Sequence, residues 1–142
     1  MSKDRIRGQM SRRILREQLF KLLFRVEFND IEEMKEQCSF FFDDIDNPIS
    51  EPDMAAIQDK FDRIMEKLNE IDSQINERAK GWSTDRMAKV DLTIIRLAVY
   101  EILFDETVPT GVAINEAVEL AKKFGQDSSF SFVNGILARF TS

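Results

Sequence analysis

The sequence contains no histidine and only one cysteine, Cys38, among its 142 residues. The usual zinc sites, and the nucleophile arrangements built on Ser-His-Asp or Cys-His, need these residue types. The chain also lacks the GxxxxGKS/T loop and the GxGxxG turn, two glycine-rich segments that hold phosphates. These absences count against an enzyme or a cofactor-dependent protein and favour a binding protein. A lone cysteine cannot form an intrachain disulfide, and we expect Cys38 to be a small buried residue.

Long apolar stretches are absent as well. No run approaches the roughly 20 residues that a membrane-spanning helix requires, and the first residues lack the apolar segment of a signal peptide. Hydrophobic residues make up 43% and charged residues 32% of the chain, which is typical of a globular protein. A length of 142 residues suits one domain. We therefore expect a single soluble domain, residues 1–142, in the cytoplasm.

Strand signals are nearly absent, and apolar residues recur at the spacing of helices. The predicted fold class is therefore all-α. The apolar segment after Asp91 is interrupted only by Arg96 and Glu101, which predicts a helix in the centre of a bundle. Gly125 is a natural helix stop, and Gly135 is expected to permit close helix packing. About seven helices are predicted, over residues 11–28, 31–43, 50–80 (or 53–80), 85–89, 91–104, 112–124 and 128–140 (or 129–140).

The first predicted helix has two apolar faces. One face carries leucines and predicts core packing. The other carries Phe20, Phe24 and Phe28 at intervals of four residues, on roughly the opposite side. Either the helix is sandwiched inside the domain, or the exposed end of this aromatic stripe docks a partner. An exposed stripe also leaves the oligomeric state open between a monomer and a homodimer.

Charge is distributed very unevenly along the chain. Residues 1–25 contain eight basic and two acidic side chains, whereas the whole chain has a net charge of −6. A local excess of arginine attracts phosphate despite an acidic remainder, because charges beyond about 8 Å are largely screened at physiological salt. Arginine also pairs bidentately with phosphate and stacks on bases. This terminus therefore predicts RNA binding, and the alternative is a solvated basic arm.

Three sequence blocks occur in one order and spacing. The first is Arg12, Arg13, Arg16 and Glu17 leading into QLFKLLF, the second is WSTDRMAKVDLTIIRLAVYE from Trp82, and the third is VAINEAVELAKKFG from Val112 followed by FVNGIL. Together they resemble the NusB family of bacterial transcription antitermination factors. The resemblance covers nearly the whole chain. It implies an all-helical fold of two packed helical subdomains, at about residues 1–80 and 81–142.

The resemblance also implies a function. Members of the family pair with NusE, a protein of the small ribosomal subunit, bind boxA RNA, and help RNA polymerase to read through terminators, notably in ribosomal RNA operons. Matched position by position, the expected RNA-binding residues are Arg12, Arg13, Arg16, Phe124, Ser128 and Phe132. The expected NusE-binding residues are Phe24 and Asp91. Arginines would neutralise phosphates while an exposed phenylalanine stacks on a base, and core packing is the alternative for the rings of Phe124 and Phe132.

The sequence departs from the family pattern at a few positions. Ser128 stands where some relatives carry an acid, so its base contact would differ. Phe24 replaces a tyrosine that is often found, which keeps the ring but loses a hydroxyl hydrogen bond. Lys3, Arg5 and Arg7 extend the basic arm, and we expect them to add electrostatic affinity without sequence preference.

Three other functions are compatible with parts of the sequence. NusB-like domains also occur in RNA-modifying methyltransferases, but this chain has no room for a cofactor domain. A helical scaffold that binds only proteins would lack salt-dependent RNA binding. An enzyme based on carboxylates would need two acids converging in a cleft.

Overall fold

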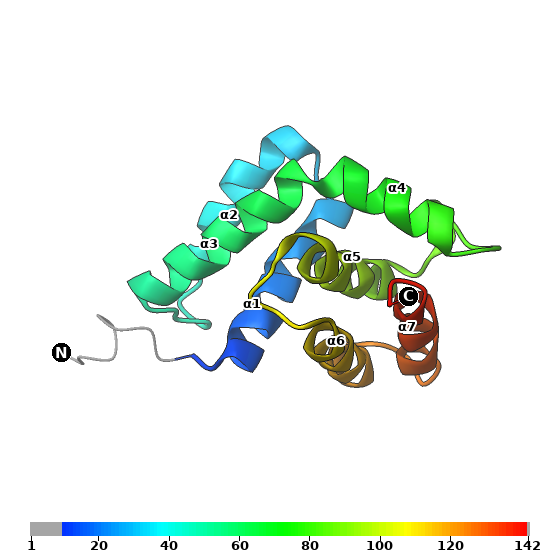
Figure 1. Cartoon of the computed structure of the whole chain (residues 1–142). Coiled ribbons are helices and arrows are strands. Elements are labelled where there is room, and N and C mark those ends of the chain that lie inside the picture. The colour runs from blue at the N-terminus through cyan, green and yellow to red at the C-terminus, as the bar shows by residue number, and fades with distance from the viewer. Residues whose placement is uncertain (1–9, 142) are drawn as a thin grey trace. The chain divides into compact units, whose positions relative to one another are not determined.

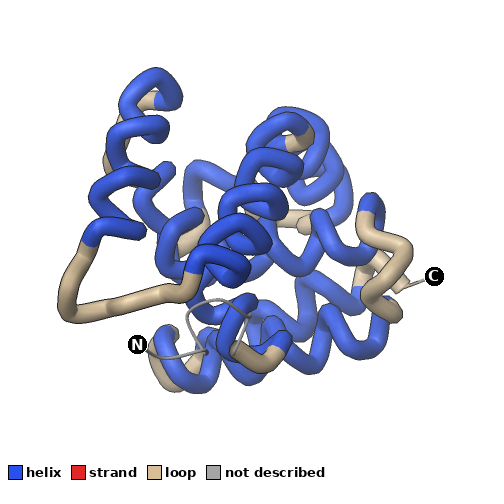
Figure 2. The backbone as a smooth tube through the Cα atoms, turned by 90° about the vertical axis from the view of Figure 1, so that its left-hand side faces the viewer, coloured by secondary structure: helices blue, strands red, loops and turns tan. Residues whose placement is uncertain are grey.

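The computed structural model describes residues 10–141, and these residues form helices and their connections, without a strand (Figures 1 and 2). The predicted all-α fold class is confirmed. The α-helices are α1 (Arg12–Phe24), α2 (Met34–Asp43), α3 (Glu51–Glu66), α4 (Leu68–Arg78), α5 (Lys89–Phe104), α6 (Thr110–Phe124) and α7 (Ser129–Ala138). Short 3-10 helices are η2 (Arg25–Glu27), η3 (Ile31–Glu33) and η4 (Thr84–Arg86). Lys3, Arg5 and Arg7 lie outside the described residues.

The chain divides into two compact units. The first unit ends at Arg63 and the second begins at Ile64, within α3. The first therefore contains α1, α2 and most of α3, and the second contains α4 to α7. The division near residue 80 that the resemblance implies stays a prediction.

In the first unit, α1 begins where the sequence predicts and ends earlier. The hydroxyl of Ser11 accepts a hydrogen bond from the backbone N–H of Ile14 at 3.2 Å, as expected of an N-cap. The predicted end at Phe28 is wrong for the α-helix, which stops at Phe24. The backbone then tightens into η2, and the N–H of Phe28 bonds the carbonyl of Arg25 at 3.1 Å. Hydrogen bonds of this kind often close the last turn of a helix.

The long third helix that the sequence predicts is broken at Lys67. The N–H of Lys67 bonds the carbonyl of Ile64 at 3.0 Å, three residues back instead of four, and α4 starts at the next residue. Ile64, Ile71 and Ile75 are fully buried on both sides of the break. The spacing of the apolar residues therefore continues across the break at Lys67, and the sequence has no proline or glycine there.

In the second unit, α5 is the central helix, as predicted. It contacts α4, α6 and α7, and Ile94, Ile95 and Val99 are fully buried. Its polar interruption at Arg96 has a partner on α4. Nε and Nη2 of Arg96 donate to the two carboxylate oxygens of Asp72, each at 2.8 Å. This fork joins the two helices through a pair of parallel charge-assisted hydrogen bonds.

Two further sequence predictions need correction. The short helix expected near residues 85–89 is the 3-10 helix η4, three residues long. Gly135 was expected to permit close helix packing, but a Cβ atom placed there would meet nothing within 4 Å. The glycine lies on an exposed part of α7, so its side is open and no neighbouring helix requires it.

Cys38 is buried on α2, with 6% of its surface exposed, which confirms the expected packing role. Burial raises the pKa of its thiol, so the neutral form dominates at physiological pH. Within residues 10–141, His, Cys, Asp and Glu form no group of three or more that could hold a metal ion. Over the same residues, no helix has the length and apolar character needed to cross a membrane.

Candidate nucleic-acid interface

The first turns of α1 concentrate positive charge. Arg16 lies four residues after Arg12 and three after Arg13, so both of these arginines neighbour Arg16 on the surface of the helix start. No acidic residue occurs in the first turn of α1. The free N–H groups at the start of a helix add to this potential, because the helix dipole places partial positive charge there. This end of α1 is suited to contact phosphates.

The three arginines differ in exposure. Arg12 and Arg13 are exposed, whereas Arg16 keeps only 9% of its surface accessible. Both Arg13 and Arg16 also interact with other groups of the protein. Arg12 and Arg13 are therefore accessible to a ligand, whereas Arg16 is largely covered.

The connection between α6 and α7 is held tightly. The hydroxyl of Ser129, a buried residue, accepts a hydrogen bond from the backbone N–H of Gln126 at 2.9 Å. A Cβ atom at Gly125 would lie 2.5 Å from the Cβ of Ser129 and 2.8 Å from the carbonyl oxygen of Ala121. Gly125 is thus required by the close approach of α7. Its φ of −91° is available to any residue, so conformational freedom is not the reason.

This connection carries the three predicted residues of the second unit. Phe124 ends α6, Ser128 directly precedes α7, and Phe132 lies one turn into α7. Ser128 is exposed, and both phenylalanines are half-buried. Complete core packing, the alternative for the two rings, is therefore not what the structure shows. Each ring keeps part of its surface available to a ligand.

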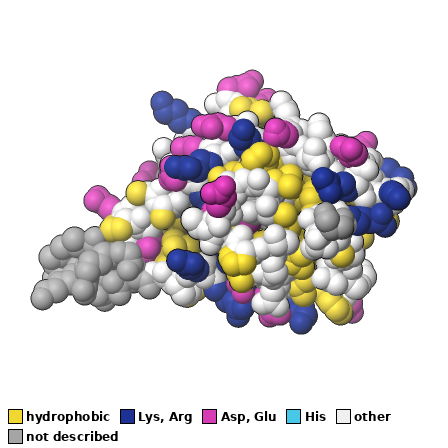
Figure 3. Space-filling view, in the orientation of Figure 1, with side chains coloured by type: hydrophobic (Ala, Val, Ile, Leu, Met, Phe, Trp, Pro, Cys, Tyr) yellow, Lys and Arg dark blue, Asp and Glu magenta, His cyan; other side chains and the backbone are white. Residues whose placement is uncertain are grey.

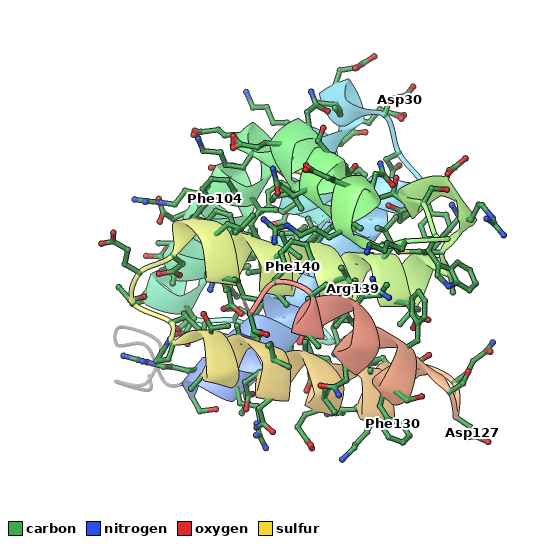
Figure 4. All side chains as sticks on the ribbon, turned by 45° about the vertical axis from the view of Figure 1, so that its right-hand side comes forward. Asp30, Phe104, Asp127, Phe130, Arg139 and Phe140 are labelled. Atoms are coloured by element: carbon green, nitrogen blue, oxygen red, sulfur yellow. The ribbon has the colours of Figure 1, made fainter. Side chains whose placement is uncertain are left out.

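Cations accompany the aromatic rings around the connection. The ammonium of Lys123 lies 5.5 Å from the ring centre of Phe124, and that of Lys122 lies 5.7 Å from the ring centre of Phe130. Phe130, which the sequence analysis did not select, is 42% exposed on the first turn of α7 (Figure 4). Alternating cations and rings suit a strand of RNA, because phosphates and bases alternate along it.

A second aromatic residue that the sequence analysis left without a role is Trp82, in the connection between α4 and η4. Its ring packs edge to face against Phe132, with ring centres 5.1 Å apart, and is 44% exposed. The guanidinium of Arg86 lies 5.5 Å from the Trp82 ring centre. Figure 3 shows Lys and Arg side chains at the right of the view, where this connection projects in Figure 1.

The residues predicted to bind a protein partner lie at two other places. Phe20 and Phe24 on α1 and Phe28 directly after η2 form a continuous row of rings, with centres 6.1 and 5.1 Å apart. Phe20 is buried, Phe24 is half-buried and Phe28 is 61% exposed. The aromatic stripe is therefore packed internally at one end and exposed at the other, and docking of a partner at the exposed end stays a prediction. Phe20 packs internally, and Phe28 with part of Phe24 forms a surface.

Asp91 lies in the first turn of α5 and is 8% exposed. Its Oδ1 atom is buried and accepts no hydrogen bond from the described residues. A buried acceptor without a donor costs about 1–3 kcal/mol. Asp91 therefore has unused hydrogen-bonding capacity at an atom that is buried from solvent.

The predicted residues thus form separate groups. The α6–α7 connection brings Phe124, Ser128 and Phe132 together, and the start of α1 brings the three arginines together. These groups belong to different units, as do Phe24 and Asp91.

Comparison with known proteins gives one consistent result. The sequence model of the NusB family matches residues 13–142. A relative from Agathobacter rectalis, named transcription antitermination protein NusB, is 54% identical over 131 residues, which cover 92% of this chain and 99% of the relative. The structure of T. maritima NusB superimposes with a TM-score of 0.82 at 35% identity, covering 93% of this chain and 91% of that one. A solved complex of the antitermination factors NusB and NusE with double-stranded RNA contains a chain with a TM-score of 0.73, 26% identity, and coverage of 91% and 94%.

Proposed function

Because the chain belongs to the NusB family of transcription antitermination proteins, we propose that it binds boxA RNA together with NusE. In this role it helps RNA polymerase to read through terminators, notably in ribosomal RNA operons. It acts by binding, without catalysis, and it does so in the cytoplasm, where bacteria transcribe their genes. The two helical units together serve as one NusB-like domain.

The observation that carries RNA binding is the α6–α7 connection. Two half-buried phenylalanines and one exposed phenylalanine lie there, and lysine ammonium groups contact two of the three rings. Stacking on such rings contributes about 1–3 kcal/mol per base. The exposed guanidinium groups of Arg12 and Arg13 supply phosphate contacts from the first unit. A solved complex of NusB and NusE with double-stranded RNA supports RNA binding in company with NusE.

Replacement of Arg12 and Arg13 by alanine is expected to weaken boxA binding on the order of tenfold or more near physiological salt. The slope of log affinity against log salt should become shallower by about 1–2, since binding releases fewer counterions from the RNA for each phosphate contact that is lost. Binding is measured by fluorescence anisotropy of labelled boxA RNA and a scrambled RNA, at several salt concentrations, with and without NusE.

The matched control is Lys35→Ala/Lys60→Ala, which removes two positive charges from α2 and α3. The RNA affinity of this variant should stay within about twofold of the wild type, because charges that do not contact the RNA are largely screened at physiological salt. Preference of the wild type for boxA that strengthens with NusE would support the proposal. Negligible binding of either RNA, even with NusE present, would instead favour a scaffold that binds only proteins.

For NusE, the α1 rings offer the clearer surface. Phe28 is 61% exposed and Phe24 continues the row toward the buried Phe20. Exposed aromatic side chains of this kind often dominate the energetics of protein interfaces. Asp91 contributes differently, because its Oδ1 accepts no hydrogen bond from the described residues and can accept one from NusE once binding exposes that buried atom.

We expect Phe24→Ala/Phe28→Ala to reduce NusE affinity by 10-fold or more, on the order of 1.5–3 kcal/mol for two aromatic contacts. Asp91→Asn should reduce it about tenfold if NusE donates a hydrogen bond to the carboxylate. Isothermal titration calorimetry measures both. Phe40→Ala removes a ring that is 54% exposed on α2 and serves as the control.

If the double variant bound NusE with unchanged affinity, Phe24 and Phe28 would not belong to the NusE interface. If light scattering then showed that the same variant converts a dimer into a monomer, the row of rings would be assigned to self-association.

A further inference from the structure

Trp82 directly follows a hydrogen-bonded turn at Gly81. Gly81 has a φ of +85°, a left-handed conformation that side chains other than glycine rarely adopt. The N–H of Trp82 then bonds the carbonyl of Ala79 at 2.7 Å. On the other side, the N–H of Thr84 donates to the side chain of Asn76 at 2.7 Å. These bonds hold the backbone on both sides of Trp82.

The ring of Trp82 is also held in place by its neighbours. Phe132 supports it through an edge contact, and the guanidinium of Arg86 lies over it. Arg86 is anchored by a hydrogen bond from Nη1 to the carbonyl of Gly81, at 3.2 Å. Even so, 44% of the Trp82 surface remains accessible. A large ring that is fixed and still exposed loses little conformational entropy when it binds a planar ligand.

The local charge indicates what kind of ligand this is. Residues 78–89 contain four basic residues and one acidic residue, in a chain whose net charge is −6. The acid, Asp85, accepts a hydrogen bond from the hydroxyl of Ser83. Arg86 has further N–H donors besides the one that bonds Gly81, because a guanidinium carries five. Positive charge beside an exposed indole suits a nucleotide better than an apolar peptide.

We propose that Trp82 is a second base-stacking platform of this protein, which binds an unpaired RNA base next to Phe132 while Arg86 contacts an adjacent phosphate. The inference rests on the proposed RNA binding and extends that surface from the α6–α7 connection to the turn after α4. The edge contact between the Trp82 and Phe132 rings makes the two platforms continuous, so neighbouring nucleotides can occupy them. Two elements far apart in the sequence would thus bind the same RNA strand.

The test uses the fact that Trp82 is the single tryptophan of the chain. Emission excited at 295 nm therefore reports on this ring alone, provided that any NusE present carries phenylalanine in place of tryptophan. Titration with boxA RNA should quench the emission, with saturation at the concentration at which anisotropy of labelled RNA saturates. RNA in which single bases are removed, one position at a time, should quench less at one position. Polyphosphate, which has no bases, should leave the emission unchanged.

Substitution provides the second readout. Trp82→Ala should weaken RNA binding on the order of tenfold, and Trp82→Phe less, since a smaller ring still stacks. Phe40→Ala, on α2, should bind like the wild type. If the ring only braces α7, RNA would not quench the emission of the wild type, and the two variants would show altered unfolding with unaltered RNA affinity.

Each outcome separates this inference from the function on which it rests. If anisotropy shows that RNA binds, yet Trp82 emission does not change or Trp82→Ala retains full affinity, the stacking proposal is overturned and RNA binding stands. If neither RNA binds in the anisotropy experiment, even with NusE, the proposed function fails and the Trp82 platform fails with it.

Discussion

Gly125→Ala is expected to destabilise the protein by about 2 kcal/mol, in the range typical of overpacking, and to weaken boxA binding severalfold. The new Cβ would lie 2.5 Å from the Cβ of Ser129 and 2.8 Å from the carbonyl oxygen of Ala121, neither of which is a flexible side-chain end. The start of α7 must move, and with it the bond that holds Ser129 to Gln126. Urea unfolding and RNA anisotropy measure the two effects.

Gly135→Ala is the matched control, because it makes the same chemical change one helix turn beyond Phe132. Nothing lies within 4 Å of the added Cβ atom, and alanine is favoured over glycine in a helix by about 1 kcal/mol. This variant should therefore be more stable than the wild type. Equal effects of the two substitutions would contradict the role assigned to the Gly125 contact.

Asp72→Ala is expected to lower the free energy of unfolding by about 2–3 kcal/mol, close to the loss found when one partner of a buried ion pair is removed. The Arg96 side chain is 12% exposed and that of Asp72 is 24% exposed, so little water can replace the lost carboxylate. Two hydrogen bonds of 2.8 Å disappear, and a guanidinium stays nearly buried without them. Urea unfolding followed by circular dichroism gives the value.

The control for this prediction is Asp59→Ala. Asp59 pairs with Arg63 at 3.0 Å, but both side chains are about two-thirds exposed, at 65% and 64%. Exposed pairs contribute a few tenths of a kcal/mol, so the loss should be small. Replacing Asp72 and Arg96 together with leucine and methionine should restore much of the stability, because no buried charge then remains unpaired. A loss below about 1 kcal/mol for Asp72→Ala would show that the fork is solvated.

Much of the fold follows from the sequence because helix faces are periodic. The central position of α5 could be predicted because its segment is apolar nearly all round. The start of α1 could be predicted because Ser11 directly precedes the periodic apolar residues of that helix. The break at Lys67 could not be predicted, since the buried isoleucines keep their spacing across it. The change from α-helix to 3-10 helix after Phe24 could not be predicted either, because the phenylalanines keep their spacing across it.

The candidate site divides along similar lines. The resemblance supplied Arg12, Arg13, Phe124, Ser128 and Phe132, and the structure shows how exposed each one is. Whether Arg16 points to solvent depends on tertiary packing, which leaves it 9% exposed, and no local pattern encodes that.

The sequence around Trp82 has features that are compatible with an exposed binding residue. It is the only tryptophan, and it follows a glycine in a segment rich in basic residues. Its contact with Phe132, 50 positions away in the sequence, could come only from the structure.

The row of rings on α1 has a consequence for how this protein can evolve. Phe24 touches both the buried ring of Phe20 and the exposed ring of Phe28, so a change that retunes the surface also disturbs the interior. Residues in direct contact rarely behave additively when substituted. A lineage that altered its partner here would need compensating changes inside the first unit. Drift at this surface should therefore be slow and should proceed through paired replacements.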